Sequence, residues 1–450
     1  MADLIISVSG LRGIIGENLT PDVAIRYVVA YATTLPGGPV VVARDSRPSG
    51  QVLAQAVHAG FHSTGRNTID AGICATPTTG VLVRRLQAAG AVQITASHNP
   101  PQYNGIKLFS NEGRVIPAEP GRVVLQRYQE GAAEWISQDR LGYMTICEDP
   151  HAPHLEAVLA TVNVQRIREK KFRVLLDSNH GAGSPLGIRL LEALGCEVKV
   201  LGEPTDGQFA HPAEPTAENL AEVQSAVPRA GAVIGFCQDP DADRLAVIDE
   251  TGRYIGEEYT VAMITDHILR QRKGPIVTNC STSRMAQDLT EKYGQRFFRS
   301  AVGEANVVDL MLAKDAIFGG EGNGGPIDPR VGMVRDSFVG MAQLLDAMSV
   351  RDLPVSKLAD ELPRYEIVKT KVSLPQAQVP RALDTLEKHF SDARSDRLDG
   401  LRLDWPSGAW LLVRASNTEP IVRACAEAST AEESKHLCDE AARVIGGLAG

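Results

Sequence analysis

The chain has 450 residues and a formal net charge of −9, from 46 Lys and Arg against 55 Asp and Glu. Because single hydrophobic cores stop growing at roughly 250–300 residues, a chain of this length should divide into about three domains, or four small ones. With 43% hydrophobic and 22% charged residues, the composition excludes general disorder. The acidic balance without a Lys/Arg block disfavours a general nucleic-acid or anionic-membrane binder, but leaves small anions as possible ligands.

The seven cysteines are scattered singly, without a Cys-x-x-Cys pair, so neither a disulfide framework nor a zinc cluster is indicated. Near the N-terminus Asp3 stands where a signal peptide needs positive charge. No apolar run approaches the ~18 residues needed to span a bilayer. The sequence therefore predicts a cytoplasmic protein without a membrane partner.

Strands and helices are predicted to alternate over most of the chain. The first group comprises a strand at 40–43, a helix at 51–64, a strand at 68–70, a helix near 79–86 and a strand at 91–95. The second comprises a strand at 172–176, a helix at 185–194, a strand at 196–201, a helix at 218–227 and a strand at 232–237. The third runs from a helix at 258–269 through strands at 275–278 and 297–301 to 316–318.

After Pro363 the pattern changes to a strand at 366–374, a helix at 380–390, two strands around 406–408 and a last helix from about Ala431. This order is typical of a smaller α+β domain. The three preceding groups predict mostly parallel or mixed sheets, whose ligand-facing loops lie at the carboxyl ends of the strands. The polar motifs of those groups fall at such positions.

The first motif is Thr-Ala-Ser-His-Asn-Pro-Pro at 95–101, followed by the polar segment 103–107. Ser97 beside His98 suggests a nucleophile and its base. However, adjacent side chains seldom point at each other, and the Gly-x-Ser-x-Gly elbow is missing, so a serine hydrolase is disfavoured. A proline-terminated turn without a function remains the alternative.

The second motif places Asp239, Asp241 and Asp243 directly after a predicted strand. Three carboxylates this close repel one another unless a cation lies among them, and oxygen ligands suit Mg²⁺ or Ca²⁺. A calcium-binding EF-hand loop is disfavoured because Arg244 stands where that loop needs Gly, and 245–248 is typical of a strand. A solvated acidic loop remains the alternative to a metal site.

Two further motifs are rich in groups that bind sugars and phosphates. In the glycine-rich segment 319–325, Glu321 and Asn323 can exchange hydrogen bonds with hydroxyl groups. It lacks the Lys-Ser/Thr ending of a P-loop and the spacing of a dinucleotide fingerprint. The segment 414–420 and Arg423 combine guanidinium, hydroxyl and amide donors suited to a phosphate. A flexible loop and a turn with a surface ion pair are the respective alternatives.

Together these four motifs, in this order and over nearly the whole chain, resemble the α-D-phosphohexomutases, which include phosphoglucomutase, phosphomannomutase and phosphoglucosamine mutase. Ser-Gly-Leu-Arg-Gly at 9–13 and the segments 44–49 and 179–183 match as well. The resemblance implies three similar α/β domains with mixed sheets and a smaller C-terminal α+β domain around a central active-site cleft. We expect domains at 1–150 with a phosphoserine loop, 151–252 with a metal-binding loop, 253–364 with a sugar-binding loop and 365–450 with a phosphate-binding loop.

The resemblance also implies roles for individual residues. Ser97 would be the phosphorylated nucleophile and, with three aspartates, a ligand of Mg²⁺; Lys107, whose pKa would have to be lowered, would be the general acid/base. The catalytic residues would be Ser97, Lys107, Arg12 and His98, and the metal ligands Ser97, Asp239, Asp241 and Asp243. Glu321 and Asn323 would bind the sugar, and Arg244, Arg414, Ser416, Asn417, Thr418 and Arg423 the phosphate.

The implied reaction interconverts hexose 6-phosphate and hexose 1-phosphate through a phosphoserine and a bound hexose 1,6-bisphosphate. Many relatives have Ser in place of Asn323, His in place of Gly325 and Gly in place of Pro240. The version found here is similar to members grouped with phosphoglucosamine mutases and archaeal-type phosphomannomutase/phosphoglucomutases, so glucosamine phosphate is the expected substrate, with mannose or glucose phosphates as the alternative.

A metal-dependent phosphatase and a binding protein on a mutase scaffold that has lost its activity are the competing hypotheses. No nucleic-acid partner is expected, and the chain would be a monomer or homodimer.

Overall fold

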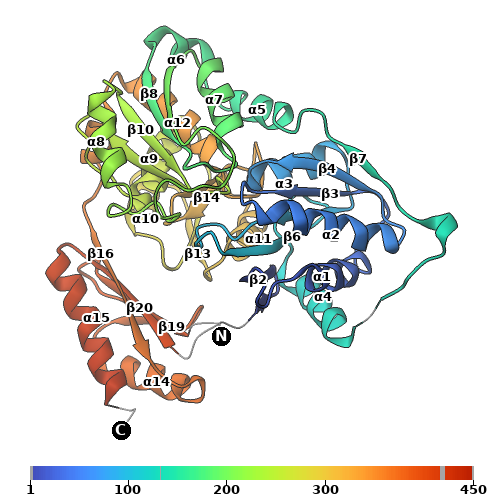
Figure 1. Cartoon of the computed structure of the whole chain (residues 1–450). Coiled ribbons are helices and arrows are strands. Elements are labelled where there is room, and N and C mark those ends of the chain that lie inside the picture. The colour runs from blue at the N-terminus through green and yellow to red at the C-terminus, as the bar shows by residue number, and fades with distance from the viewer. Residues whose placement is uncertain (1–3, 132, 416–420, 448–450) are drawn as a thin grey trace.

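The computed structural model describes residues 4–131, 133–415 and 421–447, which form four sheets with their helices (Figure 1). The first sheet is mixed and has the strand order β1-β2-β6-β5-β3-β4-β7. Its strands are β1 (Ile5–Ser7), β2 (Gly10–Ile14), β3 (Val40–Arg44), β4 (Thr68–Ile73), β5 (Gly90–Ile94), β6 (Tyr103–Phe109) and β7 (Met144–Ile146). The helices of this part are α1 (Pro21–Ala32), α2 (Ser49–Ser63), α3 (Thr76–Arg85) and α4 (Ala118–Glu130).

The second and third sheets have four strands each, in the orders β11-β10-β8-β9 and β13-β12-β14-β15. The second comprises β8 (Arg173–Asp177), β9 (Glu197–Leu201), β10 (Ile234–Gln238) and β11 (Leu245–Asp249), with α5 (Ala152–Leu159), α6 (Val164–Lys170), α7 (Ser184–Ala193) and α8 (Ala221–Arg229). The third comprises β12 (Ile276–Asn279), β13 (Phe297–Ser300), β14 (Phe318–Glu321) and β15 (Gly325–Ile327), with α9 (Glu257–Gln271), α10 (Met285–Lys292), α11 (Glu304–Lys314), α12 (Ser337–Arg351) and α13 (Val355–Asp360).

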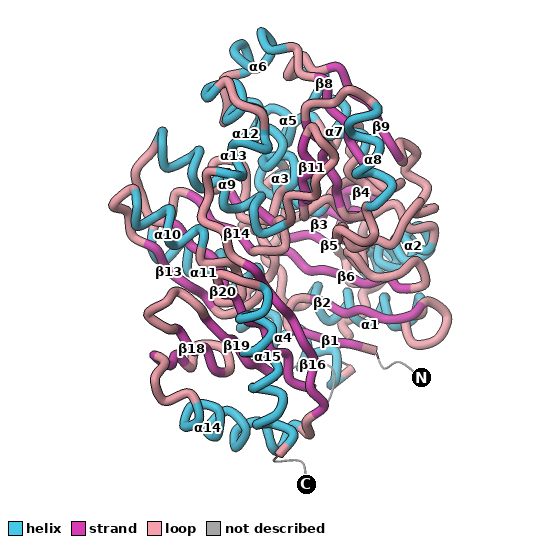
Figure 2. Tube along the Cα trace, turned by 90° about the vertical axis from the view of Figure 1, so that its left-hand side faces the viewer, coloured by secondary structure: helices cyan, strands magenta, loops and turns pink. Residues whose placement is uncertain are grey.

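The fourth sheet is antiparallel, has the order β16-β20-β19-β18-β17, and lies at one end of the molecule (Figures 1 and 2). It comprises β16 (Glu366–Ser373), β17 (Arg394–Asp396), β18 (Leu401–Asp404), β19 (Trp410–Ala415) and β20 (Ile421–Ala428), with α14 (Val379–His389) and α15 (Ala431–Gly446). The expected fold class, three α/β units followed by a smaller α+β unit, is confirmed. Within the described residues, no helix has the length and apolar character that crossing a membrane requires.

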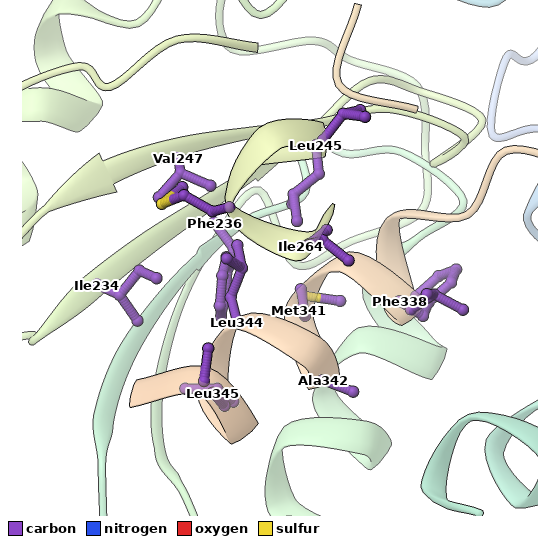
Figure 3. Packing of buried hydrophobic residues seen from close by; sticks show 14 of the residues in the cluster. Ile234, Phe236, Leu245, Val247, Ile264, Phe338, Met341, Ala342, Leu344 and Leu345 are labelled. Carbon is purple, nitrogen blue, oxygen red and sulfur yellow. The ribbon is translucent and has the colours of Figure 1, made fainter. Parts of the chain in front are cut away.

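The second and third sheets share one hydrophobic core (Figure 3). Phe236 and Val247 from the second sheet, Ile264 from α9 and Leu344 from α12 belong to the same buried cluster. The first and fourth sheets have cores of their own, and a small apolar cluster around Trp410 joins the fourth sheet to the third. Hydrogen bonds from Arg402 to the Cys280 carbonyl (2.5 Å) and from the Arg284 amide to Glu427 (2.9 Å) add to this contact. The middle of the molecule is therefore a single packed body, to which the fourth sheet is attached by a small apolar cluster and polar contacts.

Helix α12, at the centre of this shared core, was not among the predicted elements. The side chain of Asp336 caps it by accepting hydrogen bonds from the amides of Phe338 (2.9 Å) and Val339 (3.2 Å). All residues from 337 to 349 are buried, so the helix has no solvent-exposed face in this span, and its apolar residues are not confined to the one side that an amphipathic pattern requires.

We expect the substitution Phe338→Ala to destabilise the shared core by about 3–5 kcal/mol, because it removes a fully buried ring and leaves a cavity. Native-state hydrogen exchange of the α12 amides measures the opening of this core separately from the other domains. Val350→Ala, at an exposed position of the same helix, is the control and should change the opening free energy by less than about 0.5 kcal/mol. Equal effects of the two substitutions would contradict the assigned packing.

Candidate active site

Loops from all four sheets meet at one cavity of about 640 Å³. A neighbouring cavity of about 490 Å³ extends towards the fourth sheet. The residues that the first cavity shares with the sequence expectations are Arg12, Ser97, His98, Lys107, Arg244, Glu321, Asn323 and Arg423. Arg414 lines the second cavity, together with His98 and Arg423. Ser416, Asn417 and Thr418 lie outside the described residues.

Ser97 lies in a tight turn after β5, with its backbone in the left-handed region (φ 49°). This conformation is costly for a residue with a side chain and persists where surrounding contacts impose it. Here Arg47, which is fully buried, donates hydrogen bonds to the carbonyls of Ser97 (2.5 Å) and Asn99 (2.8 Å). Asp45 pairs with Arg47 (3.1 Å) and accepts from the Thr95 hydroxyl (2.7 Å). Residues of the motif at 44–49 thus stabilise the turn that contains Ser97.

The Ser97 hydroxyl is buried between a carboxylate and an imidazole. It donates to Asp239 Oδ2 (3.0 Å) and lies 3.3 Å from His98 Nδ1. The sequence argument that adjacent Ser and His side chains would not meet is therefore wrong here, because the left-handed turn brings them together. Burial, with Arg244 and Arg12 nearby, lowers the pKa of His98 to about 2, so its imidazole is neutral.

Asp239, Asp241 and Asp243 are fully buried and bring their carboxylate oxygens within 4.8 Å of one another. Burial raises the pKa of Asp239 well above its usual range, and the other two carboxylates raise it further. Asp241 Oδ1 and Asp243 Oδ1 are buried without a hydrogen-bond partner among the described residues. Unsatisfied, converging carboxylate oxygens are the donor set that hard divalent cations take, so the cluster can hold such an ion.

A threonine from the first domain positions one of these carboxylates. Thr76, the first residue of α3, donates its hydroxyl to Asp241 Oδ2 (2.6 Å) and its amide to the Asp241 carbonyl (2.9 Å). Sequence reasoning did not single out Thr76, and no local motif marks it, since the two residues are 165 positions apart.

Cations compensate the buried negative charge. Lys107, on β6, places Nζ 3.4 Å from Asp241 Oδ2 and 3.2 Å from Asp243 Oδ2. Burial lowers the pKa of this lysine, but Asp243 and Asp241 outweigh it, so the net direction is upward rather than the downward shift that a lysine base requires. Arg12 donates to Asn99 Oδ1 (2.7 Å), and Arg244 Nε lies 3.9 Å from Asp239 Oδ2.

The glycine-rich segment forms the hairpin between β14 and β15. Glu321 accepts hydrogen bonds from Asn279 Nδ2 (2.7 Å) and the Gly303 amide (3.2 Å) on Oε1, and from Arg335 Nη1 (2.9 Å) on Oε2. The Oδ1 atom of Asn323 is buried and has no partner among the described residues. A Cβ at Gly322 would lie 2.0 Å from Glu258 Oε2, so glycine is needed to bring this carboxylate against the hairpin.

The fourth sheet supplies a row of cations. Arg414 on β19 and Arg423 on β20 are directly paired in register, and Lys371 on β16 pairs with Arg423 from the other side. Lys369 and Lys371 line the second cavity with both arginines. The sequence analysis missed these lysines and also Arg335 and Glu258. The spacing Lys-x-Lys puts both lysines on one strand face, but only the sheet register brings them beside Arg423.

We expect Thr76→Val to weaken divalent-cation binding by about tenfold, because the Asp241 carboxylate loses the hydroxyl that orients it. Titration calorimetry of the purified protein with Mg²⁺ measures the change. Thr79→Val is the matched control on the same helix, since Thr79 donates to Gln93 and does not touch the carboxylate cluster. Unchanged Mg²⁺ affinity in Thr76→Val would show that the threonine does not position a ligand.

A buried hydroxyl over clustered carboxylates, with cations on every side of the cavity, defines an enzyme of phosphoryl transfer. Four consecutive family models match the chain: phosphoglucomutase/phosphomannomutase α/β/α domain I at residues 4–134, domain II at 152–252, domain III at 256–365 and the C-terminal domain at 369–444. The chain belongs to the phosphoglucomutase/phosphomannomutase family, and it is a phosphohexomutase, an isomerase.

Curated relatives match over nearly their full length. A phosphoglucomutase/phosphomannomutase of Thermococcus kodakarensis is 36% identical over 440 residues, 96% of each chain. A probable phosphoglucosamine mutase of the same organism is 34% identical over 445 residues, 97% of each chain. Among solved structures, a phosphoglucomutase/phosphomannomutase family protein of Burkholderia thailandensis has a TM-score of 0.86 at 26% identity, covering 98% of both chains.

A more distant solved structure shows the same fold. The N-acetylphosphoglucosamine mutase of Aspergillus fumigatus, solved in complex with GlcNAc-6P and magnesium, has a TM-score of 0.59 at 15% identity, covering 98% of this chain and 95% of that chain.

Proposed function

We propose that this phosphohexomutase interconverts hexose 6-phosphate and hexose 1-phosphate through phosphorylated Ser97 and a bound hexose 1,6-bisphosphate, with glucosamine phosphate as its preferred substrate. The observation that carries the mechanism is the hydrogen bond of the Ser97 hydroxyl to Asp239, in a cavity that cations from all the sheets surround. A phosphate on this oxygen would carry a charge of about −1.5 to −2, which the nearby guanidinium groups of Arg12 and Arg244 would offset.

Asp239, Asp241, Asp243 and phosphorylated Ser97 would hold Mg²⁺, which, when bound, withdraws charge from the phosphate oxygens during transfer. A substrate hydroxyl attacks the phosphorus, the P–Oγ bond of Ser97 breaks, and the hydroxyl proton leaves the sugar oxygen. Lys107, held as an ammonium by two carboxylates, is suited to donate a proton to the departing serine oxygen and to take up the proton that the sugar hydroxyl releases, so that it ends the step as an ammonium again. His98, with its very low pKa, is suited to orient the serine hydroxyl in the unphosphorylated enzyme rather than to act as its base.

The bisphosphate would then turn end for end and return its other phosphate to Ser97. Glu321 and Asn323 would hold the sugar hydroxyls in both orientations, since both line the cavity beside the serine. The phosphate that is not reacting would bind to Arg414, Ser416, Asn417, Thr418 and Arg423. Closure of the fourth domain over the substrate would exclude water from the phosphoserine.

Two observations favour glucosamine phosphate. Relatives at 30–34% identity over nearly the whole chain are named as probable phosphoglucosamine mutases. Glu258 lines the cavity beside the sugar hairpin and offers a carboxylate to an ammonium group. Burial raises the pKa of Glu258 to about 8, against the effect of Lys369, and a bound ammonium would stabilise its ionised form. The 36% identical relative named phosphoglucomutase/phosphomannomutase favours the alternative, mannose and glucose phosphates.

We expect Ser97→Ala to abolish phosphoenzyme formation, because no hydroxyl remains to accept the phosphate. Intact-protein mass spectrometry after incubation with glucose 1,6-bisphosphate and Mg²⁺ detects the phosphoenzyme. Ser110→Ala, a serine of the same domain outside the cavity, should be phosphorylated as in wild type. Full mutase activity of Ser97→Ala would overturn the mechanism, and stoichiometric release of inorganic phosphate by the wild type would identify a phosphatase instead.

We expect phosphorus NMR with the 6-phosphates of glucosamine, glucose, mannose and N-acetylglucosamine to show the fastest turnover for glucosamine. In Glu258→Gln, the preference for glucosamine over glucose should fall by about tenfold, since a hydrogen bond to a charged group contributes about 1.5–3 kcal/mol. Glu257→Gln, the neighbouring carboxylate that does not line the cavity, is the matched control. Comparable turnover of all four sugars would refute the substrate assignment.

A further inference from the structure

Arg335 is a buried arginine that joins two parts of the site through a single guanidinium group. Its Nη2 donates to Asp243 Oδ2 (2.6 Å), in the carboxylate cluster, and its Nη1 donates to Glu321 Oε2 (2.9 Å), in the sugar hairpin. Asp243 lies in the loop between β10 and β11 of the second sheet, and Glu321 is the last residue of β14 in the third sheet. Because a guanidinium is planar and rigid, displacement of one carboxylate is transmitted to the other.

The backbone around Arg335 is anchored to both loops as well. Its amide donates to Glu304 Oε1 (2.7 Å), and the next amide, of Asp336, donates to the carbonyl of Pro326 in β15 (2.8 Å). The Ser337 hydroxyl donates to the carbonyl of Ala242, between two of the clustered aspartates (2.7 Å). The start of α12 therefore spans from the carboxylate loop to the sugar hairpin.

The hairpin leaves space for this arginine at Gly325, which pairs with Glu321 in the β14–β15 register. A Cβ at position 325 would lie 2.4 Å from Arg335 Cδ and 2.8 Å from its Cγ. No side chain can be placed there without moving the arginine. Glycine at position 325 therefore provides the space that Arg335 occupies when it contacts both Asp243 and Glu321.

The contact of Arg335 with Asp243 also determines which carboxylate oxygens of the cluster remain available to a cation. Arg335 and Lys107 both engage Asp243 Oδ2, which leaves Oδ1 buried and without a hydrogen-bond partner among the described residues, 4.0 Å from Arg244 Nε. A cation bound to this cluster would compete with the guanidinium for the charge of Asp243. The guanidinium would then shift its interaction towards its other acceptor, Glu321.

We propose that Arg335 is a positioning residue that couples occupation of the carboxylate cluster by a divalent cation to the orientation of the sugar-binding carboxylate Glu321. The coupling rests on the proposed function of the two loops. It would make the sugar hairpin adopt its working geometry only when the cation is in place. By linkage, a sugar held by Glu321 would tighten cation binding by the same factor.

The test measures the hairpin rather than turnover. Amide hydrogen exchange of residues 319–327 is compared with and without Mg²⁺ alone, in the dephosphorylated full-length protein. In wild type we expect Mg²⁺ to change exchange in this segment by about fivefold or more. In Arg335→Met and Arg335→Lys the change should be lost, while residues 239–245 still respond to Mg²⁺. Lysine keeps the charge but cannot hold both carboxylates with a planar fork.

Arg330→Lys is the matched control, because Arg330 lies in the same loop and pairs with Asp328, away from the carboxylate cluster. It should keep the wild-type response. A response of the hairpin that persists in Arg335→Lys, or is missing in wild type, would overturn the proposal; if Arg335→Met does not fold, Arg335→Lys decides alone. Because no turnover is measured, absent mutase activity with an intact hairpin response would count against the proposed function and not against the coupling.

Discussion

The structure depends on burying three carboxylates at one point and compensating their charge. Isolated buried carboxylates are strongly unfavourable, and three together repel one another as well. The fold places Lys107 from the first sheet and Arg335 from the loop before α12 against them, within 2.6–3.4 Å. Two carboxylate oxygens lack a hydrogen-bond partner among the described residues, and the cluster could hold a divalent cation that completes the compensation. The cluster therefore ties three domains to one electrostatic centre.

This centre explains why the domains pack as they do. The second and third sheets share a core through α12, whose first turn contacts the carboxylate loop directly. The first domain reaches the same loop through Thr76 and Ser97. Among the described residues of the fourth domain, the contacts to the third are a small apolar cluster and hydrogen bonds such as that from Arg402 to the Cys280 carbonyl, outside the carboxylate cluster. The contacts between the first three domains are thus concentrated where the buried charge is held.

The electrostatics also separate the roles of the groups around Ser97. His98 is kept neutral by burial and by two arginines, whereas Lys107 is kept charged by two carboxylates. A neutral imidazole and a charged ammonium thus line the cavity that also holds the Ser97 hydroxyl. The net charge of −9 does not predict the positive charge around this cavity, because the cationic side chains that line it come from separate parts of an acidic chain.

The sequence by itself determined the alternation of strands and helices, the four loop motifs and their order, because strand runs and loop chemistry are local properties of the chain. It did not predict α12, because this helix is buried on all sides and shows no clear amphipathic pattern. It also did not single out Thr76, Arg335 and Lys369, because the residues near them in space are distant in sequence. It also left the direction of the Lys107 pKa open, which the carboxylates of another domain decided. Distances between loops of different domains depend on how the domains pack, and only the tertiary structure sets them.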